Sequence, residues 1–214
     1  MDGTGRGPVV VVGAGILGCS IALHLAGRAV RPVVVDQDRP GHGASPSSFA
    51  SLSAFGKDPA AYYELALAGM AAWPRWAERV GGDVGLRREG EVRWAADPSG
   101  GHARALLAQA ARFFPALRGV PVRRRILAWR AMPADRLPIV GPVPWLDTLY
   151  VAVTHSGVTV APALGRLVAL EVATGEPDGR LAPFRPGRFA ERASRVLLEV
   201  ESAFRERPHQ RPSL

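Results

Sequence analysis

A glycine-rich stretch near the start of the chain constrains its fold more than any other feature. Residues 8 to 12 read PVVVV, an apolar β-branched run typical of a strand buried in a parallel sheet. The segment Gly13–Gly18 follows with the spacing GxGxxG and leads into residues with helical periodicity. A second apolar run, Val33 to Val35, ends at Asp36. The sequence therefore predicts a strand, a tight turn, a helix and a parallel strand.

The residue types of this segment suit the binding of a dinucleotide. Gly13 permits the tight turn, Gly15 lets backbone approach a pyrophosphate, and Gly18 lets the helix pack close to the sheet. The start of the helix favours phosphate charge. Asp36 suits a ribose with free hydroxyls and would repel a 2′-phosphate, which disfavours NADP. FAD, NAD and a turn without ligand remain alternatives. The candidate residues are Gly13, Ala14, Gly15, Ile16, Gly18 and Asp36.

Composition excludes several other classes of protein. The chain has 214 residues with a net charge of +8, and the fractions of apolar and charged residues are those of a globular protein. The single cysteine, Cys19, excludes an intramolecular disulfide and a cysteine-rich zinc site, and no metal site is expected. The basic residues are almost all arginines, and they are spread along the chain. We therefore expect no nucleic-acid partner.

The sequence also bears on location. The N-terminal residues lack the order of a signal peptide. Residues 7 to 27 carry no Asp, Glu, Lys or Arg, but the three glycines in the middle of the stretch, together with a proline and a histidine, favour a strand, turn and helix over a membrane span. We expect a cytoplasmic protein with no membrane span.

Periodicity predicts further elements along the chain. Residues 41 to 57 are rich in Gly, Ser and Pro and are expected to form a loop. The elements expected after it are a helix over 60–80 kinked at Pro74, a hairpin over 86–95, a helix over 103–114, a strand over 149–153, a buried helix over 158–170 and an amphipathic helix over 189–204.

Four segments together resemble one enzyme family. They are GHGASPSSFASLSAFGKDPAAYYELALAGMAAW, WRAMPADRLPIVG, LYVAVTHSGVTVAPALG and FRPGRF. In order and spacing they are similar to the FAD-dependent oxidoreductases that include D-amino-acid oxidase, glycine oxidase and sarcosine oxidase. The resemblance covers residues 8–97 and 103–190 and is far more specific than the glycines alone. It favours FAD over NAD, because an NAD-dependent dehydrogenase would leave the later segments unexplained.

The resemblance implies an α/β fold with a Rossmann-like FAD/NAD(P)-binding domain over residues 1–190, followed by a helix and tail over 191–214. It implies oxidation of a small amine or amino acid by hydride transfer to noncovalent FAD. The residues at Gly13 to Gly18 and Asp36 would hold the ADP half. Further cofactor-binding residues are implied at Gly43, Ala44, Ser45, Gly157, Val158 and Thr159.

Individual side chains have alternative interpretations. Arg130 falls where relatives place the arginine that pairs with the substrate carboxylate, although a structural arginine is the alternative. His155 is interpreted as a structural or a proton-transferring residue, and Asp135 as turn-forming. Cys19 is expected to pack against the sheet, and neither it nor His42 matches the relatives' covalent attachment sites. No catalytic side chain is identified.

Relatives are longer by about 150 residues, the size of a whole domain. The resemblance places the missing segment near residues 98–102, so only a remnant of the usual substrate-domain sheet is expected. A cofactor without that wall would be exposed to water. The alternative function is therefore a truncated, catalytically inactive relative that binds flavin or a partner. Self-association or a partner subunit would cover the exposed apolar surface.

Overall fold

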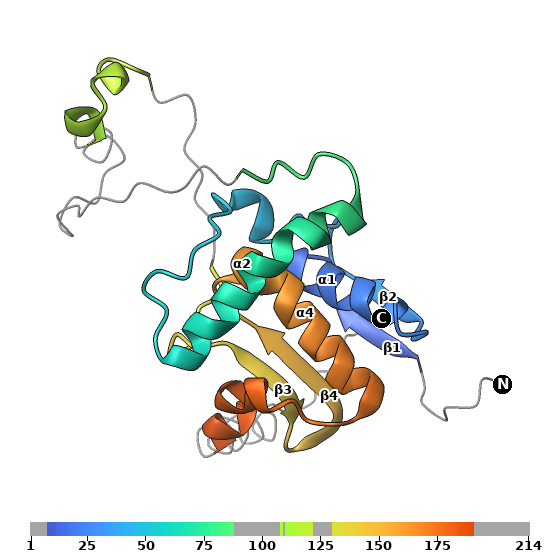
Figure 1. Ribbon diagram of the computed structural model, residues 1–214. Helices are drawn as coiled ribbons and strands as arrows, with labels where there is room; N and C mark the ends of the chain where they lie inside the picture. The colour runs from blue at the N-terminus through green and yellow to red at the C-terminus, as the bar shows by residue number, and fades with distance from the viewer. Residues whose placement is uncertain (1–7, 88–107, 109, 122–129, 191–214) are drawn as a thin grey trace, which may run out of the picture. The chain divides into compact units, whose positions relative to one another are not determined.

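The computed structural model describes residues 8–87, 108, 110–121 and 130–190. Backbone contacts divide the chain into two compact units, one within Met1–Val80 and Ala128–Leu214 and the other within Gly81–Leu127. The larger unit contains the described strands and the long helices (Figure 1). In the smaller unit, helical residues 110–113 end before the 3-10 helix η2 (Pro115–Leu117), as the sequence predicts for Pro115. The predicted domain boundary at residue 190 stays a prediction.

The first three elements form the predicted strand, turn, helix and strand. Strand β1 (Val9–Val12) pairs in parallel with β2 (Pro32–Val35), and helix α1 (Ile16–Ala26) connects them. A parallel connection of this kind needs a crossover helix, which α1 supplies. The fold class expected from the sequence, a Rossmann-like unit in a mixed α/β chain, agrees with this arrangement.

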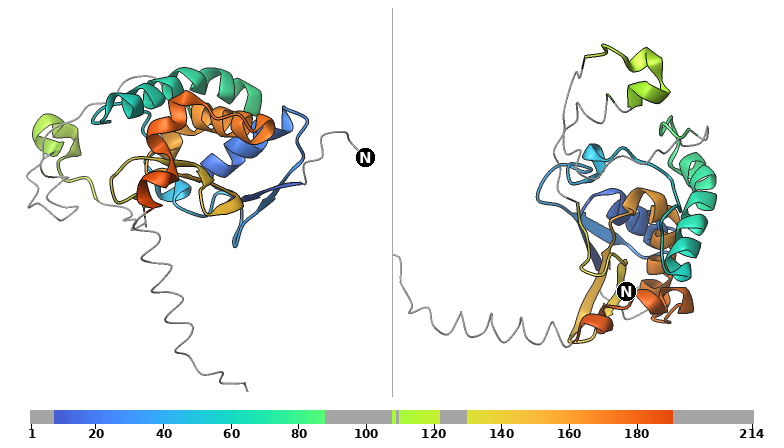
Figure 2. Two further views of the ribbon diagram at one scale, coloured as in Figure 1. Left: turned by 90° about the horizontal axis from the view of Figure 1, so that it is seen from below. Right: turned by 90° about the vertical axis from the view of Figure 1, so that its left-hand side faces the viewer.

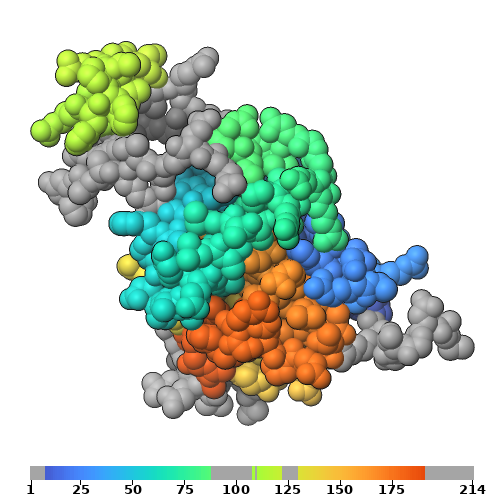
Figure 3. Space-filling view, viewed as in Figure 1, coloured from blue at the N-terminus to red at the C-terminus, as the bar shows by residue number. Residues whose placement is uncertain are grey.

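Helix α4 (Gly157–Thr174) is the centre of the core. It packs against α1 on one side and against α2 (Ala60–Val80) on the other, and Figure 2 shows the three helices as one layer over the strands. Figure 3 shows α2 on the outside of this layer. Leu164 at the middle of α4 is fully buried. The predicted buried helix over 158–170 is confirmed and extends four residues further.

Small residues allow these helices to approach closely. A Cβ atom at Gly69 of α2 would lie 2.2 Å from the carbonyl oxygen of Thr159, and one at Gly165 of α4 would lie 2.3 Å from Ser20 Oγ. Ser20 instead donates a hydrogen bond of 2.7 Å to the carbonyl of Ala161. The structure confirms the predicted helix over 60–80, because α2 spans these residues. Pro74 lies inside the helix and does not end it.

The last elements surround an antiparallel hairpin. Strand β3 (Ile139–Val143) pairs with β4 (Leu146–Val153), which begins three residues before the predicted strand. Two 3-10 helices, η3 (Gly179–Phe184) and η4 (Pro186–Phe189), follow α4 and pack against β3. The predicted hairpin over 86–95 lies mostly outside the described residues, as does all but the start of the helix over 189–204.

The β1/β2 pair leaves one apolar face exposed. Its register aligns Val10 with Val33 and Val12 with Val35, so these four side chains share a face. They are 55%, 52%, 83% and 43% exposed, respectively. Parallel sheets are normally covered on both faces. In the described part of the chain this outer valine face, Val10, Val12, Val33 and Val35, lacks such a cover.

Among the described helices, α4 has the length and apolar composition of a membrane span. However, 61% of its apolar stretch is buried inside the structure. The core helix of a folded domain has the same composition, and the contacts of α4 with α1 and α2 are of that kind.

Candidate cofactor-binding site

The predicted glycine turn has the backbone that its sequence requires. Gly13 has a φ of +106°, a conformation that favours glycine, and its N–H donates to the carbonyl of Val35 at 2.7 Å. A Cβ atom at Gly18 would lie only 1.9 Å from the carbonyl oxygen of Gly13. The same Cβ atom would lie 3.4 Å from Val11 Cγ1 of β1, so Gly18 lets α1 pack close to the turn and to the strand, and close packing against the sheet is what the sequence predicts.

Asp36 lies immediately after β2 and faces this turn. Its Oδ2 accepts a hydrogen bond of 2.6 Å from the N–H of Ala14, and its Oδ1 accepts one of 3.0 Å from the N–H of Asp38. The bond from Ala14 is the main cause that holds the pKa of Asp36 below its ordinary value. An exposed, ionised carboxylate thus lies next to the glycine turn, where it can accept further hydrogen bonds.

The loop after β2 returns to the same turn. Gly41 donates a backbone hydrogen bond to the carbonyl of Ala14 at 2.8 Å, and Ser45 Oγ accepts one from the N–H of Ile16 at 3.4 Å. Gly43 and Ala44 precede Ser45 in this loop, and the carbonyl of Ala44 accepts a bond within η1 (Ser45–Ser47). Of the three predicted loop residues, Ser45 is thus in hydrogen-bond contact with the turn.

The start of α4 approaches the start of α1. A Cβ atom at Gly157, the first residue of α4, would lie 3.8 Å from Ile16 Cγ2, at the first residue of α1. Neither helix has an acidic residue in its first turn, and neither N-cap residue, Gly15 or Ser156, caps its helix through a side chain. Two helix starts therefore converge with amide donors that an anionic ligand can accept from.

This donor set fits FAD. The start of α1 offers backbone N–H groups for a pyrophosphate. Asp36 offers a carboxylate for a ribose. Gly157, Val158 and Thr159 form the first turn of α4, where N–H groups suit the electron-rich edge of a flavin. The structure brings these predicted residues to one end of the α1/α4 pair.

The first turn of α4 is held from the side of α2 and from the loop before it. The indole Nε1 of Trp73 donates to the carbonyl of Val158 at 2.9 Å. Thr159 Oγ1 donates to the carbonyl of Ser51 at 3.0 Å and also lies 3.5 Å from the backbone N of Ser53. These bonds use a carbonyl and a hydroxyl of the turn, so they fix its position without engaging its backbone N–H groups.

Arg130 lies on a second group of residues beside α4. Its guanidinium contacts His155, with Nη2 2.8 Å from Nδ1 and Nε 3.4 Å from the backbone carbonyl. His155 Nε2 lies 3.2 Å from the hydroxyl of Tyr62, which is buried. The structure thus places two predicted candidates, Arg130 and His155, in contact with each other. His155 lies two residues before α4.

Lys57 is a member of this group that the sequence interpretation missed. Its Nζ donates to Ser156 Oγ at 2.5 Å and lies 5.2 Å from the centre of the Tyr62 ring. Lys57 is the single lysine among the 27 Lys and Arg residues of the chain. This rarity is the feature of the sequence that could have marked it as a candidate. No motif or unusual composition marks Tyr62 or Ser156 in the sequence, because their roles depend on where α2 and α4 cross.

Two other expectations have clear outcomes. Cys19 was expected to pack against the sheet, and this is wrong: it is exposed, and its Sγ donates to the carbonyl of Ala14 at 3.4 Å. The neighbouring Ser20 takes the buried position, because α1 turns that face toward α4. Asp135 is a turn residue as expected, since its Oδ1 accepts from the N–H of Leu137 at 3.0 Å.

The two arginines of the segment FRPGRF, Arg185 and Arg188, form ion pairs with carboxylates from other parts of the fold. Arg188 pairs with Asp135, with Nε 2.7 Å from Oδ2, and this hydrogen bond is the main cause of a lowered pKa of Asp135. Arg185 binds both carboxylate oxygens of the buried Glu171. Among the described residues, no three His, Cys, Asp or Glu side chains come together as metal ligands would.

Comparison with known proteins gives two findings. A family model described as DAO, FAD dependent oxidoreductase, matches residues 8–100 and 91–170. The two matches overlap over residues 91–100, next to the predicted interruption at 98–102, which remains a prediction. The chain is also similar to an opine oxidase subunit of Rhizobium meliloti, with 30% identity over 126 residues that make up 59% of this chain and 34% of that protein. The chain thus spans about a third of the length of this curated relative.

Proposed function

Because this chain belongs to the DAO family of FAD dependent oxidoreductases, we propose that it binds FAD noncovalently and takes part in oxidising a small amine or amino acid. The observation that carries the proposal is the convergence of the starts of α1 and α4 beside Asp36. We place the protein in the cytoplasm, which agrees with its single cysteine.

Each part of the site has one task in this proposal. The turn from Gly13 to Gly18 holds the pyrophosphate, and Asp36 accepts from the ribose. Ser45 closes the loop over the turn. The first turn of α4 orients the flavin and stabilises negative charge on it. The flavin, when bound, supplies the capacity to accept a hydride from a carbon that bears an amine.

Arg130 is the proposed residue for the substrate carboxylate. Its planar guanidinium suits bidentate binding of that group. It is exposed, and its hydrogen bonds to other described residues go to His155, a neutral partner that leaves the charge of Arg130 uncompensated within that part of the chain. The opine oxidase relative supports a substrate of the amino-acid class, and its description as a subunit supports assembly with a second polypeptide.

The exposed valines favour a second candidate function. The outer valine face would be covered in a complete parallel sheet. We propose as the alternative a catalytically inactive relative that retains only a remnant of the substrate-domain sheet and uses this face for a partner subunit or self-association.

An absorbance experiment distinguishes the two functions. We expect the purified chain, mixed with FAD and passed through a gel-filtration column, to keep a flavin spectrum and release FAD on denaturation. Substrate-dependent bleaching of that spectrum by amino acids would support the enzyme. A flavin spectrum without bleaching would support the inactive relative. A colourless protein at saturating FAD would contradict both forms that bind flavin.

Replacement of Asp36 by alanine should lower FAD affinity at least about tenfold, because a ribose would lose hydrogen bonds to a charged group. Titration of the protein with FAD, followed by flavin fluorescence, measures the change. Asp38→Ala is the matched control, since Asp38 is an exposed carboxylate in the same loop that binds the N–H of Arg39. Equal losses in both variants would contradict a ribose-binding role for Asp36.

A further inference from the structure

A directional series of hydrogen bonds links Arg130 to the buried core. A guanidinium can only donate, so His155 Nδ1 accepts from Arg130 Nη2 at 2.8 Å. In the neutral imidazole the ring proton then lies on Nε2. Nε2 donates to the hydroxyl of Tyr62 at 3.2 Å, and that hydroxyl can donate to Thr154 Oγ1 at 3.5 Å. The ring of Tyr62 also meets the His155 ring edge to face.

The surroundings of His155 favour its neutral form. Burial lowers the pKa of His155, and the positive charges of Lys57 and Arg130 lower it further. Lys57 reaches the site from the loop before α2, Tyr62 from α2 itself, and Arg130 and Arg136 from the segment before β3. At neutral pH the imidazole can therefore act as an acceptor for Arg130.

We propose that His155 is the positioning residue for Arg130: its neutral ring fixes the guanidinium beside the start of α4. Protonation of the ring in acid breaks the bond at Nδ1, leaves Arg130 only its bonds to the backbone carbonyl of His155, and weakens the binding of a carboxylate. The physical reason is a conflict of donors, because protonated Nδ1 carries a hydrogen that opposes the N–H of the guanidinium. This inference rests on the proposed function, in which Arg130 binds the substrate carboxylate, and adds a pH-dependent control of that residue.

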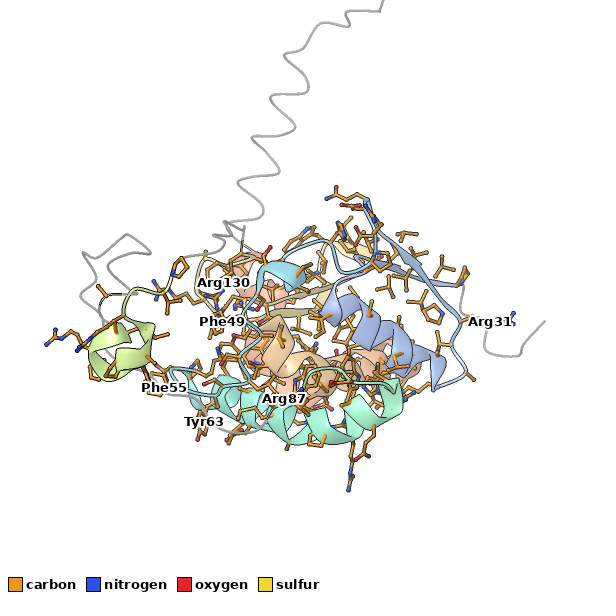
Figure 4. The ribbon with its side chains drawn as sticks, turned by 90° about the horizontal axis from the view of Figure 1, so that it is seen from above. Arg31, Phe49, Phe55, Tyr63, Arg87 and Arg130 are labelled. Atoms are coloured by element: carbon orange, nitrogen blue, oxygen red, sulfur yellow. The ribbon has the colours of Figure 1, made fainter. Side chains whose placement is uncertain are left out.

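The first test examines the hydrogen bond without any ligand. Nitrogen-15 NMR of the histidine rings in the full chain should show His155 with its proton on Nε2 at pH 7. Arg130→Gln should raise the pKa of His155, because it removes a neighbouring positive charge. Arg31→Gln removes a charge at the opposite end of this unit and should leave that pKa unchanged (Figure 4). A proton on Nδ1, or an unchanged pKa in Arg130→Gln, would overturn the proposal.

The second test measures carboxylate binding with formate as the probe and uncharged formamide as its control. The Nε–H resonance of Arg130 reports binding in every variant that keeps this arginine. We expect formate to bind about fivefold more tightly at pH 7 than at a pH below the pKa of His155 that the NMR titration gives, the usual effect of one hydrogen bond. His155→Ala should bind about fivefold more weakly at pH 7.

His155→Asn is the conservative variant, because its Oδ1 can take the place of Nδ1 as an acceptor but does not titrate. It should keep the affinity of pH 7 and lose the pH dependence. A pH dependence in His155→Asn equal to that of the unchanged protein would overturn the proposal, and so would formate that fails to bind at pH 7. FAD binding is read separately from absorbance, so failure of the cofactor site remains distinguishable from failure of this inference.

Discussion

Replacement of Glu171 by glutamine should lower the free energy of unfolding by about 3 kcal/mol at pH 7, because it leaves the charge of Arg185 without its partner in the core. Glu171 is 5% exposed, and its Oε2 accepts from Arg185 Nη1 at 2.8 Å and from the hydroxyl of Tyr150. The other oxygen accepts from Arg185 and from the N–H of Asp178. Urea unfolding followed by tryptophan fluorescence measures the loss.

The matched control is Glu176→Gln, which changes an exposed carboxylate two residues after α4. It should change the unfolding free energy by less than about 0.5 kcal/mol. A similar small effect of Glu171→Gln would contradict the role assigned to the Glu171–Arg185 pair.

The same pair makes stability depend on pH. Burial alone would raise the pKa of Glu171, but hydrogen bonds from Arg185, Tyr150 and the N–H of Asp178 hold it below the ordinary value of 4.5. Because the pKa is lower in the folded state, the stabilisation is complete above pH 4.5 and is lost as pH falls through the folded value. The difference between the unchanged protein and Glu171→Gln should therefore shrink in acid.

Replacement of Gly69 by valine should have an effect of similar size. A Cβ atom there would lie 2.2 Å from the carbonyl oxygen of Thr159 and 2.9 Å from the Cα of Val160, so α2 and α4 must separate. Overpacking of this kind costs about 3 kcal/mol of unfolding free energy. Urea unfolding measures that loss, and FAD titration should show weaker binding because the first turn of α4 moves.

Ala68→Val is the control for Gly69→Val. Ala68 is the preceding residue of α2 and is exposed, so the added methyl groups meet solvent. Its effect should be limited to the small helix propensity difference, about 0.5 kcal/mol. If Gly69→Val were no more harmful than Ala68→Val, the close contact between α2 and α4 would be refuted.

In helix α2 the periodicity of apolar residues predicts the helix itself but not the face that is buried. The spacing of Leu67, Met70, Trp73, Ala77 and Val80 predicts a helix over 60–80, and the helix is there. Yet Leu67 and Val80 are 43% and 49% exposed. The buried face is formed by Tyr62, Leu65, Ala66, Gly69 and Trp73. The crossing with α4 determines which face of α2 is buried. At this crossing Gly69 has no side chain and so permits a close contact with α4 that larger side chains would prevent.

The hairpin of β3 and β4 was only partly predictable. Residues 149–153 have the apolar β-branched character of a strand, whereas β3 contains Gly141 and Pro142, which normally weaken a strand. Pairing with β4 stabilises β3 in spite of them. Gly141 also has a φ of +144°, and a Cβ atom there would meet the side chain of Arg185 at 2.9 Å.

The sequence by itself determined the glycine turn, its flanking strands and the family, because the turn is built from local backbone preferences that Gly13, Gly18 and Asp36 encode over a short span. Only the tertiary structure decided which side chains surround α4. Lys57, Tyr62 and Arg130 reach His155 and Ser156 from segments far apart in the chain. Such contacts follow from helix crossing and burial, which no short stretch of sequence specifies.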